Sequence, residues 1–339
     1  MTMALKALLP LFLALSPSVV EATASAKRGI VYVTPEVVSD NNFWTNNSTD
    51  LTWYYNYQAQ PTTAFAKSKM QFVPMQWGKP TNPASDMSFY TAVKQLQQAG
   101  QNITWVLGFN EPDGCTDGGS CIAASDAAQA WVKQFEPMRR DLGVKVGGPA
   151  CTGADTGYKW LADFHNECAL LHGNHTGCEM DFLPVHWYGN FEGLAGHLGQ
   201  LNGTYTNISE FWVTEFAYND EPLNTTQDFY NQTISYFDKL EMISHYAYFG
   251  PFRSDVSNIG PNAAFLTQNG QLTDIGSWYL GGDATGNIPA STGGTTSGNS
   301  TFSAIPGTYS GKPFSSGYRY SIPSGWLLCV AAASAWMLF

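Results

Sequence analysis

Two glutamates stand at the ends of strand-like apolar runs. Glu111 follows the run 105–110, and Glu215 lies near the end of the run 211–216. A carboxylate in an apolar strand is costly unless it is paired or used chemically. Two such groups could hydrolyse a glycosidic bond, because one donates a proton to the leaving oxygen while the other attacks the anomeric carbon. The structural alternative is that each glutamate caps a neighbouring loop.

Eight strand-like runs could position this pair. Helical patterns at 85–99, 123–140 and 226–242 lie between some of them, with Ser85 as the expected N-cap of the first. Alternating strands and helices predict parallel βαβ units of the α/β class. Eight strands favour a single (β/α)8 TIM barrel over an open doubly wound sheet, and barrel enzymes carry catalytic groups at the carboxyl ends of the strands. The predicted runs are 29–33, 51–57, 71–77, 105–110, 144–148, 182–187, 211–216 and 245–249.

The composition narrows the class of partner. The 339 residues carry a formal net charge of −11, which argues against nucleic-acid binding because that needs clustered Lys and Arg. Aromatic residues make up 14%, which suits both a large core and the stacking of rings on sugars. We therefore expect a neutral or cationic partner and no nucleic acid.

The two ends of the chain read as targeting segments. Residues 1–26 have the charged start, short apolar run and small residues of a signal peptide, with the pair Lys27-Arg28 as a possible further processing site. A folded domain is expected over 27–282, followed by a Ser/Thr/Gly-rich stalk over 283–317. Residues 318–339 resemble a GPI-attachment signal, with Ser315 as the first candidate for attachment and a membrane tail as the alternative. These features predict a monomeric protein that is secreted and GPI-anchored at the plasma membrane or cell wall.

Cysteine use also predicts an oxidising compartment. Cys115 and Cys121 are an expected disulfide pair, as are Cys168 and Cys178, and Cys151 is an expected buried free thiol. A zinc site that combines the second pair with two histidines fits no standard spacing, so no metal is expected. Nine Asn-X-Ser/Thr acceptors suit a surface glycoprotein.

The sequence resembles glycoside hydrolase family 128, the fungal-type endo-β-1,3-glucanases with a clan-A barrel. The motifs that carry the resemblance are KRG (27–29), WYYN (53–56), FVPMQWG (72–78), LGFNEPD (107–113), VHWYG (185–189), WVTEFA (212–217) and YAYFG (246–250). The resemblance covers about residues 27–280 and implies a retaining mechanism on β-1,3-glucan, with Glu111 as acid/base, Glu215 as nucleophile and no cofactor. Alternatives are a transglycosylase, a glucan-binding protein with little turnover, or another polysaccharide as substrate.

The resemblance also implies glucan subsites at the strand ends. Without the motif, His186 could be a satisfied core histidine. Tyr57 and Tyr248 stand where the family often has Trp, and because both keep a ring we expect these swaps to affect subsite fit and not chemistry. The expected substrate-binding residues are Tyr54, Asn56, Trp77, Asn110, His186, Tyr188 and Tyr248.

Overall fold

The computed structural model describes residues 25–46, 48–116, 118–175 and 177–289. Most of the expected signal peptide, the end of the stalk and the GPI signal lie outside the described residues. Over the part described, no helix combines the length and apolar character needed to cross a membrane.

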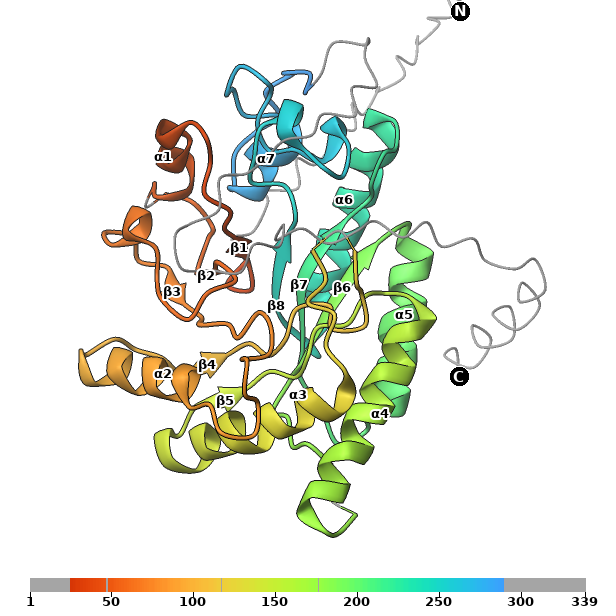
Figure 1. The fold of residues 1–339 in the computed structure, drawn as a ribbon. Coiled ribbons are helices and arrows are strands. Elements are labelled where there is room, and N and C mark those ends of the chain that lie inside the picture. Colours follow the sequence, from red (N-terminus) through yellow and green to blue (C-terminus); the bar gives the residue numbers. More distant parts are fainter. Residues whose placement is uncertain (1–24, 47, 117, 176, 290–339) are drawn as a thin grey trace, which may run out of the picture.

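Eight short strands lie at the centre of the molecule (Figure 1). Each overlaps one of the predicted runs, and every pairing between neighbouring strands is parallel, which confirms the α/β class. The strands are grouped in three sheets of order β1-β2-β3, β4-β5 and β6-β7-β8, and not in one continuous closed sheet. The strands are β1 (Gly29–Val31), β2 (Trp53–Tyr55), β3 (Gln71–Phe72), β4 (Trp105–Val106), β5 (Lys145–Val146), β6 (Leu183–Tyr188), β7 (Phe211–Ala217) and β8 (Ile243–Tyr248).

Helices α3 to α6 lie outside the strands (Figure 1). The first predicted helix begins at Ser88 and not near Ser85, because the carboxylate of Asp86 accepts from the Ser88 amide at 2.8 Å. The second predicted helix is α3 continued by π-helical turns at Trp131–Phe135 and Met138–Leu142. The helices are α1 (Asn41–Trp44), α2 (Ser88–Gln98), α3 (Ala124–Ala130), α4 (Asp155–His172), α5 (Phe191–Thr204), α6 (Leu223–Lys239) and α7 (Asp274–Tyr279), with 3-10 turns at Val38–Asp40, Thr63–Phe65, Ser254–Val256 and Pro261–Ala263.

An aromatic cluster fills the space between the amino ends of the strands. The Trp212 ring stacks on His245 at 3.7 Å and on Phe182 at 4.4 Å between centroids. Trp53 and Trp105 pack against the same indole at 5.0 and 5.6 Å. Many of the aromatic residues therefore belong to the hydrophobic core. The two glutamates lie toward the opposite, carboxyl ends of the strands.

Contacts of the fold involve Lys27, the first residue of the predicted domain, and residues that follow its predicted end at 282. Lys27 Nζ donates to the carbonyl oxygens of Phe237 and Leu240, so the possible processing pair is built into the fold. Past residue 282, Asp274 Oδ1 accepts from the amides of Thr285 and Gly286 at 2.7 Å, and the Ser254 hydroxyl reaches the Pro289 carbonyl. The start of the expected stalk is therefore attached to the domain.

The cysteine predictions are confirmed. Disulfides join Cys115 to Cys121 and Cys168 to Cys178, while Cys151 is free and buried. The first disulfide closes the loop after Glu111, and the second joins the end of α4 to the segment before β6.

Candidate active site

Glu215 lies in β7 with its side chain fully buried. Two tyrosines from the end of β2 donate to its Oε1, Tyr57 at 2.6 Å and Tyr55 at 3.3 Å. Tyr188, the last residue of β6, donates to Oε2 at 2.7 Å. The Tyr55 hydroxyl shares its one proton with the Thr214 carbonyl, which lies 3.1 Å away, so Tyr57 and Tyr188 are the stronger donors to the carboxylate.

Glu111 follows β4 and is 1% exposed. Its backbone has a φ of 39°, an unusual value for a residue with a side chain and one that is typical of functional sites. The Nδ1 atom of His186 lies 2.9 Å from Glu111 Oε1 and 3.6 Å from Glu215 Oε2. His186 in β6 therefore connects the two glutamates.

The surroundings of Glu111 favour its protonated form. Burial raises the pKa of Glu111 to about 7, the hydrogen bond and charge of His186 oppose that rise, and the charge of Glu215 adds to it. Burial on its own would lower the pKa of His186, but the carboxylates of Glu215 and Glu111 outweigh it and raise that pKa. At neutral pH this pair can hold a proton that a substrate oxygen could accept.

Glu111, His186 and Glu215 could also hold a metal ion, since one ligand atom from each lies within 4.8 Å of the others. Several of the possible ligand atoms already have protein partners, although the buried Nε2 atom of His186 has none in the part of the chain that the structure describes. Both Glu215 oxygens accept tyrosine hydroxyls, and His186 contacts Glu111 directly. The donor set fits a hydrogen-bonded acid/base pair better than a ligand set.

Asn110, just before Glu111, is 1% exposed. Its Nδ2 donates to the Gly118 carbonyl at 3.1 Å, and the Ser120 amide donates to its backbone oxygen at 3.0 Å. Both contacts come from the loop closed by the Cys115–Cys121 disulfide. Within the described residues the Asn110 Oδ1 atom has no hydrogen-bond partner, so it could accept from a ligand.

Asn56 and Trp77 lie on neighbouring loops at the carboxyl ends of β2 and β3. Asn56 Nδ2 donates to the Gln60 carbonyl at 3.0 Å, which uses its amide to hold the loop after β2. Trp77 is half-buried, and its carbonyl accepts from the Asn110 amide at 2.9 Å. Trp77 therefore lies beside the site, with part of its ring accessible.

Tyr54 and Tyr248 are not brought to the glutamates. The Tyr54 ring packs on Phe65 and Phe72 at 4.8 and 5.1 Å, and the buried Tyr248 ring packs on Phe265 at 5.5 Å. Successive residues of a strand face opposite sides of the sheet. The residues that follow Tyr54 and Tyr248 in the chain therefore face inward, toward the glutamates.

Tyr55, Tyr57 and Phe249 hold those inward positions. Phe249 reaches the Tyr188 ring at 5.8 Å, and the two tyrosines bond Glu215. The sequence prediction missed the contacts of both tyrosines with Glu215, although the period-two pattern of β2 could have shown them.

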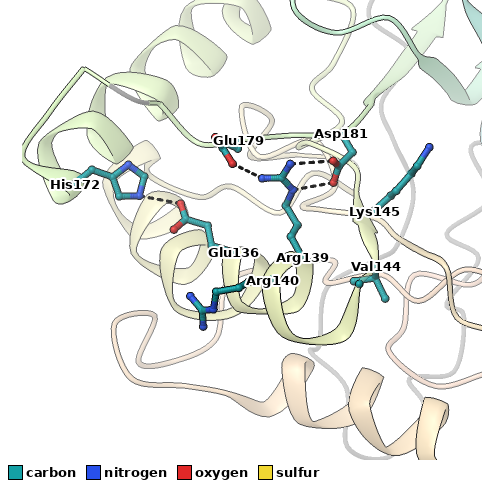
Figure 2. A pocket seen from close by; sticks show the side chains of 9 residues that line it. Glu136, Arg139, Arg140, Val144, Lys145, His172, Glu179 and Asp181 are labelled. Atoms are coloured by element: carbon teal, nitrogen blue, oxygen red, sulfur yellow. Dashed lines mark hydrogen bonds and ion pairs between the residues drawn. The ribbon is translucent and has the colours of Figure 1, made fainter.

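A second charged cluster lies near the amino ends of β5 and β6 and lines an open pocket (Figure 2). Figure 2 shows Arg139 between Asp181 and Glu179, with the Asp181 bonds at 2.9 and 3.0 Å. His172 Nε2 lies 2.9 Å from Glu136. The cluster lies at the end of the strands opposite to the glutamates. Because its charged side chains pair with one another, we interpret it as a structural ion-pair network and not as a second site.

The family model described as "Glycosyl hydrolase catalytic core" matches residues 29–279. One curated relative is the Alkali-sensitive linkage protein 1 of Schizosaccharomyces pombe, which is 24% identical over 267 residues. The match covers 76% of this chain and 45% of the relative, so the chain spans less than half of that protein's length.

Solved structures of one family share the fold. A subgroup II endo-β-1,3-glucanase of family GH128 from Pseudomonas viridiflava is 26% identical, with a TM-score of 0.61 over 77% of this chain and 99% of that one. A subgroup III curdlan-specific exo-β-1,3-glucanase from Blastomyces gilchristii, in complex with glucose, is 25% identical, with a TM-score of 0.59 over 76% and 98%. A subgroup VII oligosaccharide-binding protein from Cryptococcus neoformans is similar in fold alone, at 24% identity and a TM-score of 0.56 over 76% and 94%. The chain therefore belongs to the glycosyl hydrolase catalytic core family and, within it, to glycoside hydrolase family 128.

Proposed function

We propose that the chain is a retaining endo-β-1,3-glucanase that uses Glu111 and Glu215. The observation that carries this proposal is the pair itself: two buried carboxyl groups with oxygens within 4.8 Å, in different surroundings. Retaining glycosidases hold their carboxyl groups about 5–5.5 Å apart and inverting ones about 6.5–9.5 Å. One oxygen of each carboxyl group lies within 4.8 Å of the other, which agrees better with the retaining range than with the inverting one and supports double displacement.

In the first step Glu215 attacks the anomeric carbon while Glu111 protonates the departing sugar oxygen. The resulting ester removes the negative charge of Glu215, which is one of the causes that raise the pKa of Glu111. The pKa of Glu111 therefore falls, so after giving up its proton Glu111 stays ionised and can take a proton from the water that releases the sugar. Trp77, Asn110, His186 and Tyr188 are the proposed sugar contacts.

β-1,3-Glucan is the proposed substrate because the endo- and exo-glucanases above share the fold at 26% and 25% identity. Endo action follows from the sequence resemblance, and analysis of product lengths would separate it from exo action. The same analysis would reveal transglycosylation, in which a sugar hydroxyl replaces water as acceptor.

We further propose that the three sheets form one (β/α)8 barrel. Single parallel bridges support this: Met75 with Leu107, Gly147 with Phe182, and Arg28 with Tyr246 link the edges of successive sheets. Secretion, a stalk, a GPI anchor at the cell surface or wall and a monomeric state are proposals that rest on the sequence.

A glucan-binding protein with little turnover is the second candidate. Glu111 and Glu215 are only 1% and 0% exposed, and Tyr57 beside them is 8% exposed. A sugar must therefore displace side chains before it reaches the pair. The fold is also shared with oligosaccharide-binding proteins.

Release of reducing ends from laminarin by the secreted chain tests the two candidates. We expect wild type to cleave and Glu215→Gln to lose roughly four orders of magnitude in rate, as when a nucleophile is removed. Glu192→Gln, an exposed carboxylate on α5, is the matched control and should cleave normally. Activity should survive EDTA, because no step passes through a metal. If wild type and Glu215→Gln both bind laminarin and neither cleaves it, the binding function is supported instead.

A further inference from the structure

Tyr57 has an unusual backbone for a tyrosine. Its φ is 61°, in the left-handed region that residues with side chains rarely adopt. The side chain of the preceding Asn56 supports the turn, with Nδ2 donating to the Gln60 carbonyl at 3.0 Å and Oδ1 accepting from the Gln58 amide at 3.3 Å. Strained positions of this kind are found where a side chain must be held for function.

The strained turn delivers the Tyr57 hydroxyl to one oxygen of the nucleophile. The donor–acceptor distance to Glu215 Oε1 is 2.6 Å, the shortest of the three tyrosine bonds to this carboxylate. The Tyr57 ring packs against the Tyr55 ring at 5.1 Å and is 8% exposed. Tyr55 at the end of β2 and Tyr57 just after it therefore approach the same oxygen of Glu215.

The other oxygen accepts the Tyr188 hydroxyl at 2.7 Å and lies on the side of Glu111. Glu215 Oε2 lies 3.6 Å from His186 Nδ1, which itself lies 2.9 Å from Glu111 Oε1. The terminal torsion of a glutamate is broad and roughly two-fold, so the side chain alone does not fix which oxygen faces a substrate. External hydrogen bonds have to do so, and here Tyr57 holds Oε1 while Tyr188 holds Oε2.

We propose that Tyr57 is a positioning residue that holds Oε1 of Glu215, so that Oε2 attacks the anomeric carbon. This rests on the proposed hydrolytic function. In the step, Oε2 forms the bond to carbon, the bond from carbon to the leaving oxygen breaks, and that oxygen takes the proton of Glu111. Oε1 becomes the carbonyl of the ester and keeps the Tyr57 hydroxyl as donor. On hydrolysis the water oxygen bonds to carbon, Glu111 takes its proton, and Glu215 leaves as the carboxylate.

A positioning role gives Tyr57 a function that the Trp often found at this position in the family would not have in the same form. A Trp ring could pack on a sugar as Tyr57 could, but it has no hydroxyl to donate to Oε1. The exchange of Trp for Tyr would then affect the chemistry as well as the subsite fit expected from the sequence.

The test compares Tyr57→Phe with wild type in the secreted chain. The readouts are kcat and KM on laminarin, the melting temperature, and the rate at which 2-deoxy-2-fluoro-laminaribiosyl fluoride labels Glu215, followed by intact mass. We expect kcat and the labelling rate to fall together by roughly ten- to a hundredfold, with KM within about twofold, because misplacing a reacting group costs rate. Tyr230→Phe, which deletes a buried hydroxyl of α6 that has no partner in the part described, should change neither rate.

Three results would overturn the proposal. Unchanged kcat and labelling in Tyr57→Phe would remove the positioning role, and a raised KM at unchanged kcat would make Tyr57 a sugar contact only. If wild type neither cleaves laminarin nor becomes labelled, the proposed hydrolytic function itself fails, and this inference fails with it. Should Tyr57→Phe fold poorly, Tyr57→Asn gives a second comparison, because Asn tolerates the left-handed backbone and its short side chain lacks the phenol.

Discussion

Glu111 and Glu215 are the same residue type, and their neighbours separate their roles. Glu215 accepts three phenolic hydroxyls, whereas Glu111 has an imidazole as its partner and a buried position that raises its pKa to about 7. Pairs of titratable groups in different surroundings are how one site supplies an acid and a nucleophile together. The proposed assignment of Glu111 as acid and Glu215 as nucleophile therefore depends on His186 as well as on the two glutamates.

This dependence predicts a pH effect. The acid must be protonated, so kcat/KM should fall as the pH rises through about 7 in wild type. His186 lowers the pKa of Glu111, so His186→Leu should raise that pKa and move the alkaline limb to higher pH, besides reducing the rate. The measurement is kcat/KM on laminarin from pH 4 to 9. His165→Leu, on α4 away from the pair, should leave the limb in place, and a downward shift in His186→Leu would contradict the assignment.

At the scale of elements, the two disulfides close loops of similar length, but only one of these loops contacts the site. The Cys115–Cys121 loop bonds Asn110 beside the acid, whereas Cys168–Cys178 joins α4 to the segment before β6. Removing either should cost about 2 kcal/mol of stability, from the loop-closure term for loops of this length. Only the first loop positions a residue next to Glu111.

We therefore predict that the double variant Cys115→Ala/Cys121→Ala loses roughly tenfold or more in kcat/KM, because Asn110 is no longer held. Cys168→Ala/Cys178→Ala should keep its kcat/KM while it loses similar stability. Urea unfolding and laminarin kinetics on both variants make the comparison. Equal kcat/KM in the two variants would show that the loop has no part in the site.

The same scale explains what the sequence could and could not predict. The strand-like runs located all eight strands, because short apolar runs bounded by turn residues are a strong signal. Which face each residue takes depends on where a strand starts, and this is why Tyr54 and Tyr248 were expected at the site while Tyr55 and Phe249 lie inward. The sequence pattern did not single out α5, because its several glycines lower helix propensity and tertiary packing overrides them.

At the scale of the whole molecule, the first strand, β1, lies beside the last strand, β8, and the buried Arg28 connects them; we call this contact the seam. Arg28 is 3% exposed and pairs with Tyr246 of β8 through a single parallel bridge. Its guanidinium bonds Asp50 at 2.9 Å, the Tyr246 hydroxyl at 3.0 Å and the Tyr279 carbonyl at 3.3 Å. Three separate segments, β8, α7 and the turn before β2, thus depend on one side chain whose planar fork Lys cannot reproduce.

Arg28→Met should therefore lower the free energy of unfolding by up to about 3–5 kcal/mol, because it removes a buried guanidinium and leaves Asp50, whose side chain is 13% exposed, without its partner. Arg140→Met removes an exposed pair with Asp141 and should leave the free energy of unfolding nearly unchanged. Urea unfolding of both variants measures the difference. At temperatures where Arg28→Met is folded, its kcat on laminarin should match wild type, because the seam lies at the amino ends of the strands and the glutamates at the carboxyl ends. A stability loss no larger than that of Arg140→Met would show that packing, and not this arginine, holds the first and last strands together.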